Sequence, residues 1–259
     1  PWNLPYCTGG SSSGSGAGVA ARFFTAALGS DTGGSIRLPA TICGVTGLKA
    51  TQTRVSRAGV MPLSFSADNV GPLVRTARDA ARFLRVVAGH DPEDPTSARE
   101  PVPDYEAALN GDAKGLRIVV LETGFLDGAD APVATAFEDS MKALTAQGAI
   151  VTRANAPEIM RAVNAYTAVI SRVEGATIHG NWMRGRAGDY AIHLSARLYG
   201  GYAMPGHTYV EALSRRGPLL RRFVAEVMGG ADLVATPTLK TRVPTLAETD
   251  IDADPANWD

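Results

Sequence analysis

Apolar residues along this chain occur either at helical spacing or in short continuous runs, and segments of these two kinds alternate. Runs with a helical period, or with a small and apolar composition, predict helices at residues 14–27, 38–43, 76–89, 133–148 and 157–172. Short apolar runs predict strands at residues 45–49, 116–121, 149–152 and 232–236, and the run at 24–28 fits either a strand or a helix end. This alternation is typical of an α/β protein whose sheet is covered by helices on both faces.

Local signals mark where some of these elements begin and end. Thr76 and Asp79 have the spacing of a capping box, and Gly89 ends the same helix, while Asp68 is expected in a turn or cap. A second capping box and a helix breaker follow later in the chain, at Thr208, Glu211 and Gly217-Pro218. The sequence therefore predicts a helix near residue 208 that breaks or kinks at its proline.

The composition narrows the class of protein without giving a function. The 259 residues are enough for one large core, and 25 basic residues balance 26 acidic ones, which argues against a nucleic-acid partner. Two cysteines make no disulfide framework and indicate a reducing compartment, the cytoplasm. No apolar run is long enough to cross a membrane, and the four histidines stand singly, so we expect no membrane contact, no metal and no cofactor.

The strongest chemical signal lies in residues 9–44, which hold two Gly-Gly-Ser elements. Their serines, Ser11 and Ser35, lie 24 positions apart. Glycine-rich backbone takes unusual torsions and lets a ligand come close. Asp31 precedes the second element and Arg37 follows it, so we expect an ion pair that holds the shape of the loop. The stretch indicates a serine nucleophile in a loop of exposed backbone N–H groups.

Four interpretations of this stretch compete. A phosphate-binding or dinucleotide-binding loop is disfavoured, because no Gly-Lys-Ser/Thr follows and Val19 stands at the third glycine position. A nucleophile elbow centred on Ser12 lacks the buried strand that must precede it. A flexible linker would not run straight into an apolar helix and a second, charged motif. The fourth interpretation is a serine hydrolase without histidine, in which a second serine relays the proton to a lysine.

The order of these motifs resembles the amidase signature family. The segments that carry the resemblance are GGSSSGSGAG, ALGSDTGGSIRLPATICGVTGLKA, TRVSRAGV and SADNVGPLVRTARDAA. They match closely over residues 1–90, whereas residues 91–240 match more loosely. The resemblance implies an α/β/α fold with a mixed β-sheet core between helices, incomplete in this chain. It also implies a single domain over 1–259, made of a catalytic signature core (1–90), a variable helical and βαβ region (91–231) and a strand with an extended tail (232–259).

The resemblance also assigns roles to residues. Ser35 corresponds to the nucleophile that forms an acyl-enzyme, and Ser11 to a bridging serine, which in the family follows a cis peptide bond. The oxyanion hole corresponds to the backbone N–H groups of Thr32, Gly33, Gly34 and Ser35. A supporting polar network corresponds to Ser12, Asp31 and Arg37.

The third catalytic residue of the family, a lysine, lies upstream of the Gly-Ser elements, and we expect it outside this chain. We assign its role to none of the lysines present, which are Lys49, Lys114, Lys142 and Lys240. Both ends look cut, so we interpret the chain as an internal fragment without the lysine region and the final strands. Alone, it is expected to be inactive.

These assignments predict hydrolysis of a carboxylic amide C–N bond, giving an acid and ammonia or an amine through a Ser35 acyl-enzyme. Two alternatives stay open: the glutamine-hydrolysing subunit of a tRNA-dependent amidotransferase, and a non-catalytic binding paralogue that keeps the fold. The expected partner is a small-molecule amide with no directly bound nucleic acid, and a homodimer is compatible with the sequence.

Overall fold

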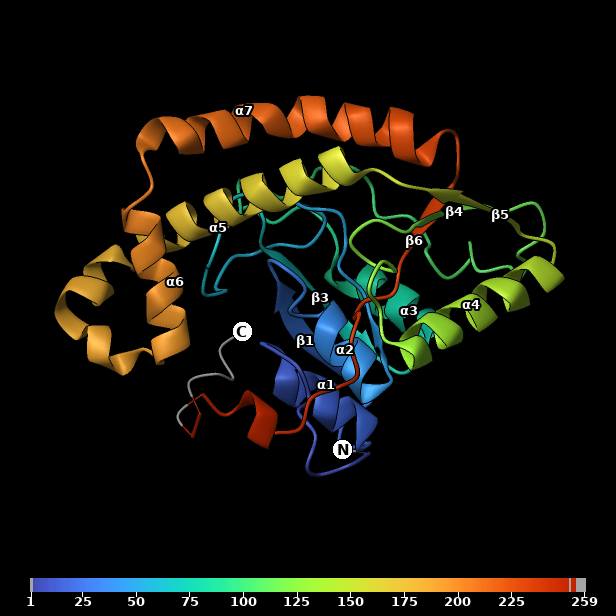
Figure 1. Ribbon diagram of the computed structural model, residues 1–259, viewed down its shortest axis with the longest axis horizontal. Helices are drawn as coiled ribbons and strands as arrows, with labels where there is room; N and C mark the ends of the chain where they lie inside the picture. The colour runs from blue at the N-terminus through green and yellow to red at the C-terminus, as the bar shows by residue number, and fades with distance from the viewer. Residues whose placement is uncertain (1, 252, 255–259) are drawn as a thin grey trace. The chain divides into compact units, whose positions relative to one another are not determined.

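The computed structural model describes residues 2–251, 253 and 254. The chain divides into two compact units, one over Pro1–Asn110 with Val243–Asp259 and the other over Gly111–Arg242 (Figure 1). The expected single-domain organisation stays a prediction, and the end of the expected tail, residues 252 and 255–259, lies outside the described residues.

The first unit is built on a three-stranded antiparallel sheet. Its strands are β1 (Ala26–Asp31), β2 (Thr46–Gly47) and β3 (Asn69–Val74), and its helices are α1 (Ser13–Ala20), α2 (Arg37–Cys43) and α3 (Ala77–Val87). The strand order is β1-β3-β2, so β3 is central, and every residue of β3 is buried. At one end of the β1–β3 ladder Asp31 pairs with Asn69.

Helices cover both faces of this sheet. Val70 packs in one apolar cluster with Leu84 of α3, whereas Leu73 packs in another with Ala40 of α2. Because successive side chains of a strand point to opposite faces, these two clusters lie on opposite sides of β3. Helix α1 packs against α2 and β1. The loops at the end of β1 are therefore held between a packed sheet and two short helices.

The second unit is built on a three-stranded parallel sheet. Its strands are β4 (Arg117–Leu121), β5 (Ile150–Ala154) and β6 (Leu233–Ala235), in the order β5-β4-β6, and its helices are α4 (Ala131–Ala146), α5 (Pro157–Arg186), α6 (Ile192–Tyr202) and α7 (Gly206–Phe223). Parallel and antiparallel pairing both occur, as the expected mixed fold requires, but they occur in two separate hydrogen-bonded sheets.

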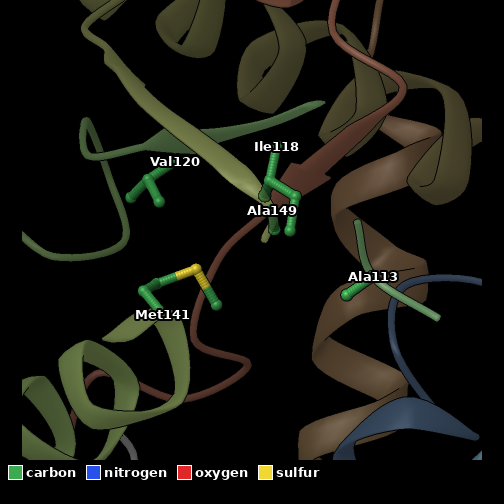
Figure 2. Close-up of a cluster of buried hydrophobic side chains, with 5 residues drawn as sticks. All are labelled: Ala113, Ile118, Val120, Met141 and Ala149. Atoms are coloured by element: carbon green, nitrogen blue, oxygen red, sulfur yellow. The ribbon is translucent and has the colours of Figure 1, made fainter. Parts of the chain in front are cut away.

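Strand β4 forms the centre of the second unit's core. Figure 2 shows Ile118 and Val120 of β4 on the same side as Met141 of α4, and these residues form one buried cluster with Ala113 and Ala149. Leu121, on the other face of the strand, packs with Ile159 of α5 and with Val227. Helices therefore lie on both faces of this sheet too, as the sequence predicts.

Several predicted elements are confirmed. Helix α3 begins behind Thr76, whose Oγ1 accepts a hydrogen bond from the Asp79 N–H at 3.1 Å, so Thr76 caps this helix as expected. Strands β4 and β6 fall within their predicted ranges, and β5 overlaps its range and extends two residues beyond it. The helix from Pro157 is longer than expected and continues to Arg186.

Two local predictions are wrong, and a third is wrong in part. The helix expected over 14–27 ends at Ala20, because Arg22 takes a left-handed φ of 64° that no helix continues. Residues 26–31 form β1, so the run at 24–28 takes the strand alternative that the sequence left open. Helix α7 begins at Gly206 without a side-chain cap, so Thr208 starts no capping box. Of the break or kink expected at Pro218, the break does not occur, because Pro218 lies inside that helix, and the kink stays a prediction. Packing of α7 along α5 outweighs the local cost of an internal proline, about 3 kcal/mol (Figure 1).

Candidate active site

The two Gly-Gly-Ser elements lie side by side in the first unit. The Ser12 N–H donates to the backbone oxygen of Ser35 at 3.2 Å, so the residue after Ser11 touches the second element directly. The peptide bond between Gly10 and Ser11 is cis, as the resemblance to the amidase signature family implies. The Ser11 side chain is exposed and Ser35 is half-buried, so both serines are open to an approaching molecule.

Ser12 fastens the first element to the end of β1. Its Oγ donates to the Ser30 oxygen at 3.3 Å and accepts from the Ser30 N–H at 3.3 Å. One turn further along α1, Ser15 Oγ donates to the Leu28 oxygen at 2.7 Å. The start of α1 is thus attached to the strand that leads into Ser35, which gives Ser12 a supporting contact separate from the Asp31–Arg37 pair.

The Asp31 carboxylate organises the second element. It is fully buried and accepts hydrogen bonds from the Gly34, Ile36 and Arg37 N–H groups at 2.9, 3.1 and 3.3 Å. The Arg37 guanidinium adds two more, from Nε at 3.0 Å and Nη2 at 2.8 Å, which confirms the expected ion pair. Burial alone raises the pKa of Asp31, but the bonds from Arg37 and the Ile36 N–H outweigh it and hold this pKa below its usual value.

The Asp31 contacts decide which N–H groups of the loop are available. The Gly34 N–H already donates to Asp31, whereas the N–H groups of Thr32, Gly33 and Ser35 have no hydrogen-bond partner within the described residues. Gly34 has a φ of 136°, and a Cβ added to Gly33 or Gly34 would meet no atom within 4 Å. Three free donors therefore surround an open stretch of backbone, whereas the fourth expected donor, the Gly34 N–H, is engaged by Asp31.

The two serine hydroxyls that sequence reasoning selects are also unengaged. Within the described residues neither Ser11 Oγ nor Ser35 Oγ has a hydrogen-bond partner. Lys49 lies near enough for its charge to interact with Arg37 and Asp31, although its Nζ donates to the Ala50 oxygen at 2.9 Å. Burial first, and then the charge of Arg37, hold the pKa of Lys49 below its usual value. The arrangement offers a nucleophile, a neighbouring hydroxyl and free donors for a developing negative charge.

Sequence reasoning missed one contact to this loop. Thr32 Oγ1 donates to Asp68 Oδ1 at 2.5 Å, and Asp68 Oδ2 accepts from the Leu63 and Ser64 N–H groups at 2.7 and 2.9 Å. Asp68 caps its turn as expected, but its bond to the serine loop spans 36 residues. The pairing of β1 with β3 brings Asp68 to Thr32, so this contact could have been predicted only if β3 had been recognised as a strand.

Other residues that drew attention in the sequence lie elsewhere or are structural. Cys43 is buried, as expected of a packing cysteine, and burial raises the pKa of its thiol. Over the residues that the structure describes, no group of three His, Cys, Asp or Glu side chains is placed to hold a metal ion. No helix in the same part of the chain is long and apolar enough to cross a membrane.

Comparisons with known proteins agree on one family. The family model described as Amidase matches residues 1–258. A glutamyl-tRNA(Gln) amidotransferase subunit of Roseiflexus castenholzii is 40% identical over 93% of this chain. The corresponding subunit of Thermotoga maritima has a crystal structure that matches all of this chain with a TM-score of 0.80 and 32% identity. A 6-aminohexanoate cyclic dimer hydrolase, solved with its substrate, matches 96% of the chain with a TM-score of 0.80 and 29% identity.

The chain spans about half the length of these relatives. It covers 54% of the Roseiflexus protein, 56% of the Thermotoga protein and 54% of the cyclic dimer hydrolase.

Proposed function

The chain belongs to the amidase family, and from that premise we propose that it carries the nucleophile of an enzyme that hydrolyses carboxylic amides. The observation that carries the proposal is the Ser35 loop. A half-buried serine with a free hydroxyl lies beside a second Gly-Gly-Ser element, and three backbone N–H groups around it have no partner among the described residues. Such a set of donors suits a carbonyl oxygen that gains negative charge.

In the proposed mechanism Ser35 attacks the amide carbonyl and Ser11 relays the proton. Ser35 Oγ gives its proton to Ser11, which passes its own to a lysine that we place outside this chain. The Oγ–C bond forms, and the N–H groups of Thr32, Gly33 and Ser35 hold the oxyanion. The C–N bond then breaks as the leaving nitrogen takes the proton, and water releases the acid from the acyl-enzyme by the same route in reverse.

Two further expectations belong to this proposal. Cys7 and Cys43 are free thiols, which suits the reducing cytoplasm. The substrate is a small-molecule amide, and self-association into a homodimer stays a prediction.

A panel of amides tests the proposed function. The complete protein that contains this chain is assayed on aliphatic, aromatic and glutamine amides, with Ser35→Ala as the test variant. Ser140→Ala is the matched control, because Ser140 is an exposed serine of α4 whose Oγ donates to the Ala136 oxygen in its own helix. We expect Ser35→Ala to reduce kcat by at least about 10⁴-fold without lowering the melting temperature, and Ser140→Ala to retain activity. Full activity of Ser35→Ala contradicts the proposal.

A second candidate is the glutamine-hydrolysing subunit of a tRNA-dependent amidotransferase. It is favoured by the Roseiflexus and Thermotoga relatives, both named as subunits of glutamyl-tRNA(Gln) amidotransferase. The same panel separates the two candidates. A preference for glutamine that appears only with copurified partner subunits and tRNA supports the amidotransferase, whereas turnover of simple amides by the protein alone supports a free-standing amidase. Binding without any turnover supports a non-catalytic paralogue.

A further inference from the structure

We propose that Asp68 is a positioning residue, which sets the direction of the free N–H groups in the serine loop by holding the Thr32 side chain. The inference rests on the proposed function, because it concerns the donors that stabilise the oxyanion. Its starting point is the 2.5 Å hydrogen bond from Thr32 Oγ1 to Asp68 Oδ1, the contact that sequence reasoning missed.

The bond lies where the β1–β3 ladder stops. Asp31 and Asn69 are the last residues of β1 and the first of β3 to pair, and Thr32 and Asp68 are the next residue on each side. No backbone hydrogen bond joins Thr32 to Asp68 among the described residues. The hydrogen bond between the Thr32 and Asp68 side chains therefore stands where the next backbone pair of the ladder would be. It fixes the serine loop at the point where the loop leaves the sheet.

Asp68 is itself held firmly. Its side chain is nearly buried, and Oδ2 accepts from two successive N–H groups, those of Leu63 and Ser64. A carboxylate that accepts three hydrogen bonds in a buried setting has little freedom to rotate, because leaving a buried acceptor unpaired is costly. The Asp68 carboxylate that holds Thr32 is therefore fixed by the N–H groups of its own turn and directly precedes the fully buried strand β3.

Two buried carboxylates thus hold different parts of the loop. Asp31 fixes its far half through the N–H groups of Gly34 and Ile36, and Asp68 fixes its near end through Thr32. The three free N–H groups lie on Thr32, Gly33 and Ser35, in the stretch that these two carboxylates bracket. Donors that stabilise an oxyanion must be oriented before the reaction begins. Loss of the contact between Asp68 and Thr32 should therefore weaken transition-state stabilisation more than substrate binding.

A pair of Thr32 variants in the complete protein tests this role. Thr32→Val removes the hydroxyl and keeps the shape, whereas Thr32→Ser keeps the hydroxyl. We expect Thr32→Val to lower kcat by about 10- to 100-fold with KM changed by less than about threefold, and Thr32→Ser to stay within about threefold of the unaltered protein. Asp68→Asn should lose a similar factor, and Thr32→Val with Asp68→Asn together should be no slower than the slower single variant.

A second readout separates positioning from general loosening. A trifluoromethyl ketone, which forms an oxyanion adduct with a nucleophilic serine, should bind Thr32→Val more weakly by the factor lost in kcat/KM, while affinity for the product acid is unchanged. If Thr32→Val does not fold, Thr32→Ala replaces it in the same comparison.

The outcomes distinguish this inference from the proposed function. An unaltered protein that hydrolyses no amide and takes no serine-directed label at Ser35 overturns both. An active unaltered protein whose Thr32→Val variant keeps full kcat overturns the role of Asp68 alone. Equal losses in Thr32→Val and Thr32→Ser also overturn it, because the hydroxyl then does not matter.

Discussion

The five hydrogen bonds that the Asp31 carboxylate accepts all come from residues within six positions of it. One side chain therefore folds the serine loop back on the end of β1, and Arg37 balances its charge. The Arg37 side chain is 47% exposed whereas Asp31 is fully buried, so solvent screens the pair from one side only. The shape of the loop therefore depends on both Asp31 and Arg37.

Replacement of Arg37 tests this dependence. Arg37→Leu leaves a buried carboxylate with its three backbone donors and no cation, so we expect it to lower the free energy of unfolding by about 1–3 kcal/mol. Urea unfolding followed by circular dichroism measures the change. Arg85→Leu is the matched control, because its ion pair with Asp104 is exposed on both sides and should contribute less. Equal losses in the two variants contradict the account.

The lowered pKa of Asp31 predicts how stability depends on pH. A carboxyl whose pKa is lower in the folded state than its ordinary 3.8 stabilises the fold above that value, and this contribution is lost as pH falls through the folded pKa. Between pH 6 and pH 2 the unaltered protein should therefore lose stability more steeply below about pH 4 than Asp31→Asn does. Urea midpoints over this range measure both curves. Parallel curves contradict the prediction, since other acidic groups would then account for the whole acid effect.

At the scale of elements, close contact between helices explains one of the least obvious sequence choices. A Cβ added to Gly201 of α6 would lie 2.1 Å from the Arg172 backbone oxygen of α5, whereas one added to Gly200 would meet only the Arg172 Cδ at 3.9 Å. The two neighbouring glycines of α6 therefore have different roles. Gly201 lets the two helices approach, whereas a Cβ at Gly200 would make only an ordinary van der Waals contact.

This pair gives a matched test of α5–α6 packing. We expect Gly201→Ala to destabilise the protein by about 1–3 kcal/mol, because backbone rather than a flexible side chain must move. Gly200→Ala should be neutral or stabilising by up to about 1 kcal/mol, because alanine favours helix more than glycine does. Thermal unfolding of the two variants measures the difference. A Gly201→Ala variant as stable as Gly200→Ala contradicts the close contact.

Elements with strong local signals could be predicted from the sequence, and elements that depend on distant partners could not. Helix α3 carries its own cap and apolar face, so its bounds follow from Thr76 onward. Strand β3 was missed because Gly71 and Pro72 both argue against a central strand. Its pairing on both sides and its complete burial outweigh those local preferences.

At the scale of the whole molecule, most residues of the candidate site could be predicted from the sequence because they lie in one continuous stretch. Ser11, Asp31, Ser35 and Arg37 fall within 27 residues of sequence. Asp68 could not be placed, because only the β1–β3 pairing brings it to Thr32. The division into two units could not be predicted from the sequence either. The segment after residue 242 returns to the first unit, where the Cys7 N–H donates to the Pro244 oxygen at 3.1 Å, and no local signal marks that return.

The role of Ser35 is the central claim, and a covalent label tests it most directly. The complete protein is treated with a fluorophosphonate, digested, and mapped by mass spectrometry beside its Ser35→Ala variant. Our account predicts a single phosphonylated site at Ser35, loss of amide hydrolysis in proportion to labelling, and no label in the variant. Hydrolysis that continues in fully labelled protein, or a label that inactivates the enzyme from another residue, would contradict it.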